Sequence, residues 1–215
     1  MQKHDPNNWH DFFDTFNVFS NSLRLESLIR PIGEYNPPPG KILEVGLGSG
    51  ATSRILADMG YTVTAVDIDE KVVARAQGIS TFPEETLTIR QMDMFHLEFP
   101  ENHFDVVIHQ GVMEHFGDDK IVEALSEQQR VARYVIFDVP NNRDNEKHYG
   151  DERFLSLARW RTLIKRAGLN IIAYNGRMCP RWTFILPHAL FKNKGPVTSA
   201  VNKMFGKAYC FICKG

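Results

Sequence analysis

The stretch from Lys41 to Gly50, which reads KILEVGLGSG, constrains the fold of this chain most. Its first half is a short apolar run, of the kind that a parallel strand shows when both of its faces are covered. Its second half holds Gly46, Gly48 and Gly50, whose missing Cβ atoms allow a tight turn and let backbone N–H groups approach a ligand. Apolar residues at helical spacing follow as far as Gly60, a typical helix stop. A strand, a glycine turn and a helix together predict a ligand-binding cradle.

The glycine turn fits a dinucleotide-binding pattern. Gly46, Gly48 and Ala51 match the fingerprint G-x-G-x-x-G/A. Asp67 follows at roughly the distance expected of the residue that holds a ribose. This pattern by itself is compatible with an oxidoreductase of the nicotinamide type.

The segment Glu44–Gly50, EVGLGSG, also resembles the first motif of the class I methyltransferases, which use S-adenosylmethionine. In that motif an acidic residue at the strand end is followed by G-x-G-x-G. The resemblance implies an α/β fold with a Rossmann-like, mostly parallel sheet of seven strands and helices on both faces. The implied strand order is 3-2-1-4-5-7-6 with strand 7 antiparallel, and Glu44, Gly46, Gly48 and Gly50 are implied to bind the cofactor.

A second strand is expected from Tyr61 to Ile68, with an acidic residue near its carboxyl end. A carboxylate at that position can accept hydrogen bonds from both hydroxyls of a ribose. Asp67 is therefore the candidate ribose ligand, and the resemblance adds Ile68 to the cofactor-binding residues. The alternative role for Asp67 is a helix N-cap, but Asp69 is better placed for that role.

A third strand is expected from Leu87 to Met94, and it too ends in an acidic residue. In the methyltransferase family this place holds the adenine, with the carboxylate facing the exocyclic amine and an apolar neighbour beside the ring. Asp93 and Met94 fit that pattern. The alternative for Asp93 is a purely local role, because Asp is common in turns after strands.

A fourth strand is expected over residues 104–111, and it opens into the sequence VMEHF. In open α/β sheets ligands bind outside the carboxyl ends of the strands, where the strand order reverses. The resemblance implies that Gln110 binds the cofactor here and that the pair Glu114 and His115 lies near the methyl donor.

The methyl group of a sulfonium is already activated, so a protein contributes chiefly in-line positioning and exclusion of water. A hydroxyl or amine acceptor also needs a base for its proton. His115 is the first candidate, followed by Glu114, His148 and Tyr149; the alternative for His115 is an orienting or structural role. His109 lies inside a strand and is expected to be a packed core residue.

The rest of the chain completes the alternation of strands and helices. A terminal strand inserted antiparallel between the fifth and sixth is typical of the methyltransferase family and absent from the usual nicotinamide-binding domain. About thirty residues separate the last two strands, which is long for a connection and predicts a cap at about residues 177–207. The further elements expected are a helix at about 118–133, a strand at 134–139, a helix from about 154 to 167, and strands at 170–174 and 209–213.

Residues 1–40 precede the first core strand and are rich in aromatic residues at spacings of three and four. Such spacing predicts amphipathic helices that form either a lid or a layer packed on the sheet. The resemblance favours a lid, with Arg24 as the candidate partner of the methionyl carboxylate. The domain organisation expected is a helical lid at 1–40 and a core at 41–215.

Composition narrows the function classes. A chain of 215 residues with 43% hydrophobic residues suits one α/β core with additions. A net charge of −1 gives no global field that would attract nucleic acid, although the region from Arg177 to Lys214 is locally basic and fits either a solvated face or an anionic substrate or lipid headgroup. No apolar run approaches the ~20 residues that cross a bilayer.

Three cysteines and the absence of a signal-peptide pattern predict a reducing, cytoplasmic location. Cys210 and Cys213 lie in an apolar strand, where residues three apart point to opposite faces, so buried cysteines are favoured over a redox or metal pair. None of the eight histidines belongs to a pattern with metal-ligand spacing, so no metal is expected.

These observations favour a methyltransferase that moves a methyl group from S-adenosylmethionine to an O, N or C atom of a small molecule. The aromatic N-terminus and the apolar insert favour an apolar or aromatic acceptor. A homodimer is left open, as is a lipid acceptor. The alternatives are an NAD(P)-dependent oxidoreductase and a binding module that keeps the cofactor cradle without turnover.

Overall fold

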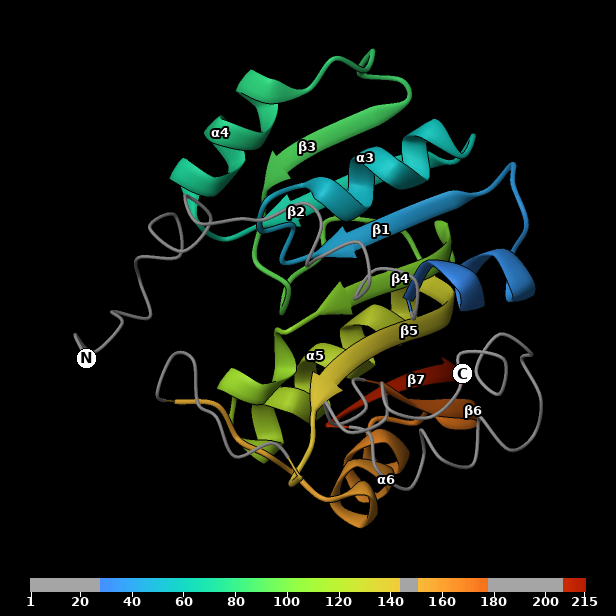
Figure 1. Ribbon diagram of the computed structural model, residues 1–215, viewed down its shortest axis with the longest axis vertical. Helices are drawn as coiled ribbons and strands as arrows, with labels where there is room; N and C mark the ends of the chain where they lie inside the picture. The colour runs from blue at the N-terminus through green and yellow to red at the C-terminus, as the bar shows by residue number, and fades with distance from the viewer. Residues whose placement is uncertain (1–27, 144–150, 178–206) are drawn as a thin grey trace, which may run out of the picture.

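The computed structural model describes residues 28–143, 151–177 and 207–215. Seven strands form one sheet: β1 Lys41–Val45, β2 Thr62–Asp67, β3 Leu87–Gln91, β4 Phe104–Gln110, β5 Ala132–Pro140, β6 Asn170–Arg177 and β7 Ala208–Lys214. Their order is β3-β2-β1-β4-β5-β7-β6 (Figure 1). The first five strands are parallel, and β7 runs antiparallel to both β5 and β6. The strand order and the direction of the last strand are those that the sequence predicted.

Helices cover both faces of the sheet (Figure 1). The named helices are α3 Ala51–Asp58, α4 Glu70–Ile79, the short 3₁₀ helix η1 Met113–His115, α5 Asp118–Val131 and α6 Leu157–Arg166. Helices α3 and α4 pack on one face with residues 28–35, whereas α5 and α6 pack on the other. Within the described ranges no helix is both long enough and apolar enough to cross a membrane.

The central strands are buried on both faces, as parallel strands between two helical layers must be. Along β1, Ile42 packs toward α3 while its neighbour Leu43 packs toward the opposite layer, and both side chains are fully buried. Ile108 and Val107 repeat the alternation on β4. This arrangement explains why the apolar runs in the sequence are continuous rather than alternating.

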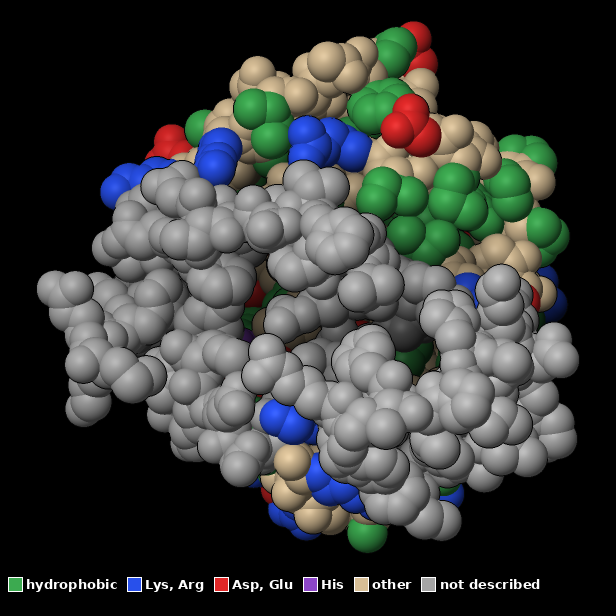
Figure 2. Space-filling view, viewed as in Figure 1, with side chains coloured by type: hydrophobic (Ala, Val, Ile, Leu, Met, Phe, Trp, Pro, Cys, Tyr) green, Lys and Arg blue, Asp and Glu red, His purple; other side chains and the backbone are tan. Residues whose placement is uncertain are grey.

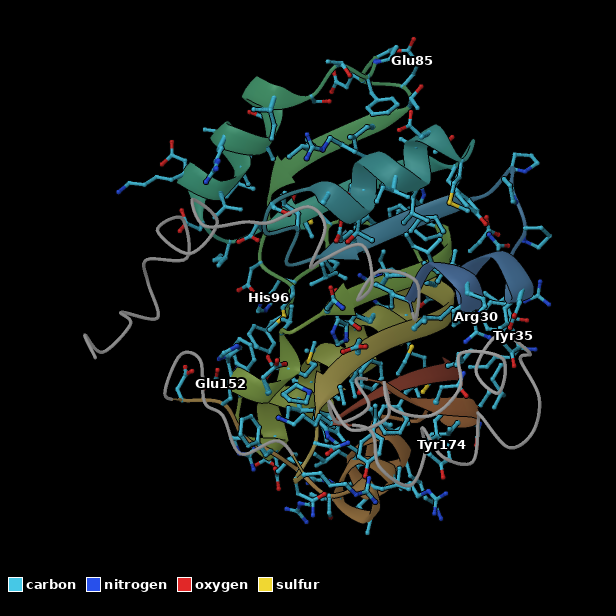
Figure 3. All side chains as sticks on the ribbon, in the orientation of Figure 1. Arg30, Tyr35, Glu85, His96, Glu152 and Tyr174 are labelled. Atoms are coloured by element: carbon cyan, nitrogen blue, oxygen red, sulfur yellow. The ribbon has the colours of Figure 1, made fainter. Side chains whose placement is uncertain are left out.

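The helical residues 28–35 belong to the sheet's own packing layer. Leu28 and Ile32 are fully buried in the same cluster as α3. Tyr35 meets Tyr134, with a ring-centroid distance of 6.0 Å, beside the start of β5 (Figure 3). This part of the N-terminal segment is therefore packed on the sheet, whereas residues 1–27, on which the lid prediction depends, lie outside the described residues.

Several element boundaries differ from the sequence prediction. β3, expected to reach Met94, ends at Gln91. β5 begins at Ala132, directly after α5, because the backbone turns to an extended conformation there (φ −144°, ψ 154°). α6 begins only at Leu157, because the Ser156 hydroxyl accepts a hydrogen bond from the Arg159 N–H (3.3 Å) and caps the helix. β6 continues to Arg177, and the predicted cap then falls almost wholly on residues 178–206, outside the described residues.

The two cysteines of β7 are structural. Cys210 faces the layer that contains α3, and Cys213 faces the layer that contains α5 and α6. Both side chains are fully buried, and burial raises the pKa of Cys213 to about 12. The prediction of buried strand cysteines is confirmed.

Ion pairs join the two helices on the α5 face. Figure 2 shows Lys and Arg side chains gathered near α6. Hydrophobic side chains lie instead over α3 and the loop that leads into β1 (Figure 2). Arg159 pairs with Asp118, and Arg166 Nη2 lies 2.7 Å from an oxygen of Asp119. These contacts fix α6 against the beginning of α5.

Candidate active site

The glycine turn after β1 packs against the segment that follows β4. The N–H groups of Gly46 and Leu47 donate to the Val66 carbonyl at 2.9 and 3.2 Å, which ties the turn to β2. Gly46 has a φ of +71°, and a Cβ atom there would lie 2.6 Å from Val112 Cγ2. Only glycine fits this position, because a side chain would need both the positive φ and the space that Val112 fills.

Asp67 joins the end of β2 to the glycine turn. Its Oδ2 accepts a hydrogen bond from the Gly48 N–H (3.3 Å), and its Oδ1 accepts one from the Asp69 N–H (3.1 Å). Burial raises the pKa of Asp67, while the backbone N–H groups of Asp69, Gly48 and Ile68 lower it. Asp69 in turn caps α4 by accepting from the Lys71 N–H (2.8 Å), which leaves Asp67 for another role.

Glu44 is a buried carboxyl group beneath the turn. It is 4% exposed and accepts a hydrogen bond from the Ser53 hydroxyl on α3. Burial raises its pKa to about 7, and the nearby charge of Asp67 adds to the shift. A cationic ligand above the turn would favour the ionised form of Glu44.

The end of β3 lies next to Asp67, whose carbonyl accepts from the Met92 N–H (2.9 Å). Asp93 follows, and its Oδ1 accepts from the Phe95 N–H (2.9 Å) while its Oδ2 lies 3.7 Å from His96 Nδ1 (Figure 3). The local turn role expected as an alternative is therefore present. The Asp93 side chain is still 46% exposed, so it retains accessible surface for a ligand.

Two apolar residues flank this edge. Ile68 is 59% exposed, an unusual position for a large apolar side chain, and it lies directly after the Asp67 carboxylate. Met94 is partly buried against the cores on the α5 face. Both could contact a flat apolar ring at this edge of the sheet.

Gln110 ends β4 and carries a buried polar atom that fits a ligand. Its Nε2 has no hydrogen-bond partner among the described residues. A buried donor left unsatisfied costs free energy, so an acceptor atom on a bound molecule would be stabilised there. The amide, the glycine turn and the Asp67 carboxylate lie on the adjacent strands β4, β1 and β2, in the positions expected for a nucleoside ligand.

Beyond Gln110 the chain forms η1, which holds the Glu-His pair. Glu114 is 5% exposed. The His115 side chain is 7% exposed, and its Nδ1 lies 2.8 Å from Asp151 Oδ1. Tyr149, His148 and Arg24, the other candidates, lie outside the described residues.

Asp151 was not found by sequence reasoning. It lies 36 residues from His115 and belongs to no recognisable motif. Only the return of the chain from β5 toward η1 brings the two together.

His109 is a core residue, as its place inside a strand predicted. It is fully buried and stacks on Phe137, with a ring-centroid distance of 4.8 Å. Burial lowers its pKa to about 3, so the imidazole stays neutral.

The fold and the motifs favour S-adenosylmethionine over a nicotinamide cofactor. A methyltransferase-domain family model matches residues 43–134, which extend from β1 to the start of β5. The antiparallel β7 between β5 and β6 completes the strand order implied for that family. Together the family-model match and the strand order support a class I S-adenosylmethionine-dependent methyltransferase.

Relatives of this methyltransferase chain differ in their acceptors. The eEF1A lysine and N-terminal methyltransferase of Homo sapiens is 26% identical over 133 residues, covering 59% of this chain and 19% of that protein. The ubiquinone biosynthesis O-methyltransferase of Pseudomonas fluorescens is 30% identical over 139 residues, covering 58% of this chain and 59% of that protein. The chain thus spans less than two thirds of the length of either relative.

Solved structures share the fold of the described part of this chain. The magnesium protoporphyrin IX methyltransferase of Synechocystis, determined with bound S-adenosylhomocysteine, matches with a TM-score of 0.67. The match covers 96% of this chain and 93% of that chain at 17% identity. At that identity the likeness supports the common architecture alone.

Proposed function

We propose that this chain binds S-adenosylmethionine across the carboxyl ends of β1, β2 and β3 and transfers its methyl group to an acceptor beside η1. The observation that carries the proposal is the contact between Asp67 Oδ2 and the Gly48 N–H at 3.3 Å. This contact holds a carboxylate at the end of one strand against the glycine turn of the next. A carboxylate so placed can accept from both ribose hydroxyls, as a nucleoside ligand requires.

Each predicted residue then has a role. Asp67 holds the ribose, and Asp93, Met94 and Ile68 surround the adenine. The backbone at Gly46, Gly48 and Gly50 lets the cofactor approach closely, and Arg24 would pair with its carboxylate. The Gln110 amide donates to the cofactor, and the buried Glu44 supplies negative charge below its cationic end.

When bound, the cofactor supplies a methyl group that is already activated by the positive sulfur. The residues of the chain orient the two reactants in line and exclude water from them. His115 lies at the switch in strand order and takes the proton that a hydroxyl or amine acceptor loses. Glu114 and Tyr149 are the further candidates for this step.

We assign the acceptor to small molecules, with an apolar or aromatic character. The name of the Pseudomonas relative, a ubiquinone biosynthesis O-methyltransferase, supports this class. The human relative, named for methylation of eEF1A, supports a protein acceptor as the second candidate. In either case the lid expected over residues 1–40 is proposed to be formed by the part before Leu28, since residues 28–35 pack on the sheet. Residues 41–215 are proposed as the core, and about 177–207 as a cap over the acceptor.

Methyl transfer from S-adenosylmethionine with a labelled methyl group tests the proposal. The chain is incubated separately with a panel of phenols, hydroquinones and amines, and with a mixture of unmodified proteins. Label on a small molecule supports the primary assignment, and label on protein alone supports the second candidate. If S-adenosylhomocysteine binds but no acceptor takes up label, the chain is a binding module. If it does not bind, the proposed function is wrong.

A further inference from the structure

His115 and Asp151 form a hydrogen-bonded pair between two parts of the chain that meet at the candidate active site. His115 belongs to η1, directly after β4, and Asp151 belongs to the segment between β5 and α6. The His115 Nδ1 to Asp151 Oδ1 distance is 2.8 Å. The histidine is 7% exposed and the aspartate 43%, so the imidazole is shielded while the carboxylate reaches it from the solvent side.

The segment around Asp151 is fixed to η1 by contacts of its own. The Arg153 N–H donates to the Glu114 carbonyl (2.8 Å), and Arg153 Nη1 donates to the Phe116 carbonyl (2.6 Å). Arg153 Nη2 also donates to Asp118 Oδ1 (2.7 Å) at the start of α5. These three contacts hold the segment in a defined position beside η1. The contact between Asp151 and His115 is therefore one of several between the two parts of the chain.

Glu152, between Asp151 and Arg153 in the sequence, also packs against this part of the chain. Glu152 is 4% exposed and lies beside the start of α5 (Figure 3). Farther along the segment, Leu155 forms an isolated parallel bridge with Asn141, just after β5. Residues 151–155 are thus held at both ends, so the position of the Asp151 carboxylate is set by the backbone.

The pairing has a chemical consequence for His115. An ionised carboxylate only accepts hydrogen bonds, so the neutral imidazole must carry its proton on Nδ1. The lone pair is then on Nε2, which becomes the nitrogen that can accept a proton. A carboxylate that orients a histidine in this way also stabilises the imidazolium once the proton arrives.

We propose that Asp151 is a positioning residue for methyl transfer: it fixes the tautomer and orientation of His115, so that Nε2 receives the proton of the acceptor. This inference rests on the proposed function of His115 as the base. Asp151 itself touches neither reactant in this account. The strap formed by residues 151–155 sets its place.

Imidazole ¹⁵N spectroscopy of the full-length chain tests the tautomer directly. At alkaline pH the wild-type His115 is expected to show a protonated Nδ1 and an unprotonated Nε2, with the signals assigned through His115→Ala. Asp151→Ala is expected to lose this pattern and give mixed tautomers, and Asp151→Glu to restore it in part. Asp119→Ala, which removes an exposed ion pair with Arg166, is the control and should leave the pattern unchanged.

S-adenosylhomocysteine binding by the same variants separates this inference from the proposed function. Asp151→Ala and Asp151→Asn are expected to bind it as the wild type does, because the carboxylate lies in the acceptor half of the site. Transfer to an acceptor should fall at least tenfold in kcat with little change in the KM of the cofactor. A proton on Nε2 of wild-type His115, or a tautomer that Asp151→Ala leaves unchanged, would overturn the inference even if the cofactor binds.

Discussion

Val112 Cγ2 lies 2.6 Å from the place that a Cβ atom on Gly46 would occupy. The turn after β1 and the segment after β4 are therefore in contact at the carboxyl edge of the sheet. Through this contact the proposed cofactor cradle is joined to η1, which begins at Met113 and carries His115. This packing contact adds to the pairing of β1 with β4 in holding the two parts of the proposed site together.

Gly46→Ala should destabilise the chain. The added methyl group meets Val112, and the positive φ of +71° is unfavourable for alanine. Strain and overpacking together predict a loss of roughly 2 to 4 kcal/mol in the free energy of unfolding. Urea titration measures it, and an unchanged midpoint would contradict the packing described here.

Gly78→Ala is the matched control. Gly78 lies in α4, and a Cβ atom there would have nothing within 4 Å. Alanine in a helix is favoured over glycine by about 0.5 to 1 kcal/mol, so this variant should be slightly more stable than the wild type. A comparable loss in both variants would mean that the Gly46 effect is not specific to the turn.

Glu44 should make the stability of the ligand-free chain depend on pH. Its pKa is about 7 in the folded state and 4.5 as an ordinary glutamate, so the folded state binds more protons between these values. Stability therefore falls as pH rises from about 4.5 to about 7 and levels off above, by on the order of 3 kcal/mol. Urea unfolding across this range should show the slope.

Glu44→Gln should reduce that slope, because glutamine does not titrate; Asp67, whose pKa burial also raises, still contributes to what is left. Glu85→Gln, at an exposed position far from the site, should retain it (Figure 3). Equal slopes in all three proteins would show that Glu44 is not the group responsible.

The thiols of Cys210 and Cys213 should resist alkylation in the folded chain. Both are fully buried, and a pKa of about 12 leaves Cys213 almost without reactive thiolate at neutral pH. Iodoacetamide followed by peptide mass spectrometry should modify them only after unfolding in urea. Rapid labelling of both in native buffer would contradict the central position of β7.

The sequence was most informative where local patterns repeat. Apolar runs ending in Glu44, Asp67 and Asp93 predicted three parallel strands, because the carboxyl ends of such strands meet at one edge. The antiparallel β7 followed from the family resemblance. Contacts between distant residues carry no such pattern, and so Asp151 beside His115 was missed.

Element boundaries were predicted less well for a related reason. The start of α6 depends on the Ser156 cap, so the apolar Phe154, which continued the helical spacing, lies before the helix. The sequence also could not show that the Asp93 side chain both accepts a hydrogen bond within its turn and stays accessible to a ligand. Its turn contact with the Phe95 N–H and its exposure follow only from the folded chain.

Calorimetric titration with S-adenosylhomocysteine shows whether a nucleoside cofactor binds at Asp67. The account predicts saturable binding at one site, weakened roughly 100-fold by Asp67→Ala, since two charge-assisted hydrogen bonds to the ribose cost about 3 kcal/mol when lost. Asp105→Asn, which alters a carboxylate at the opposite edge that accepts from the Lys41 N–H (2.8 Å), should bind as the wild type does. No binding by the wild type, or equal affinity in Asp67→Ala, would contradict the account.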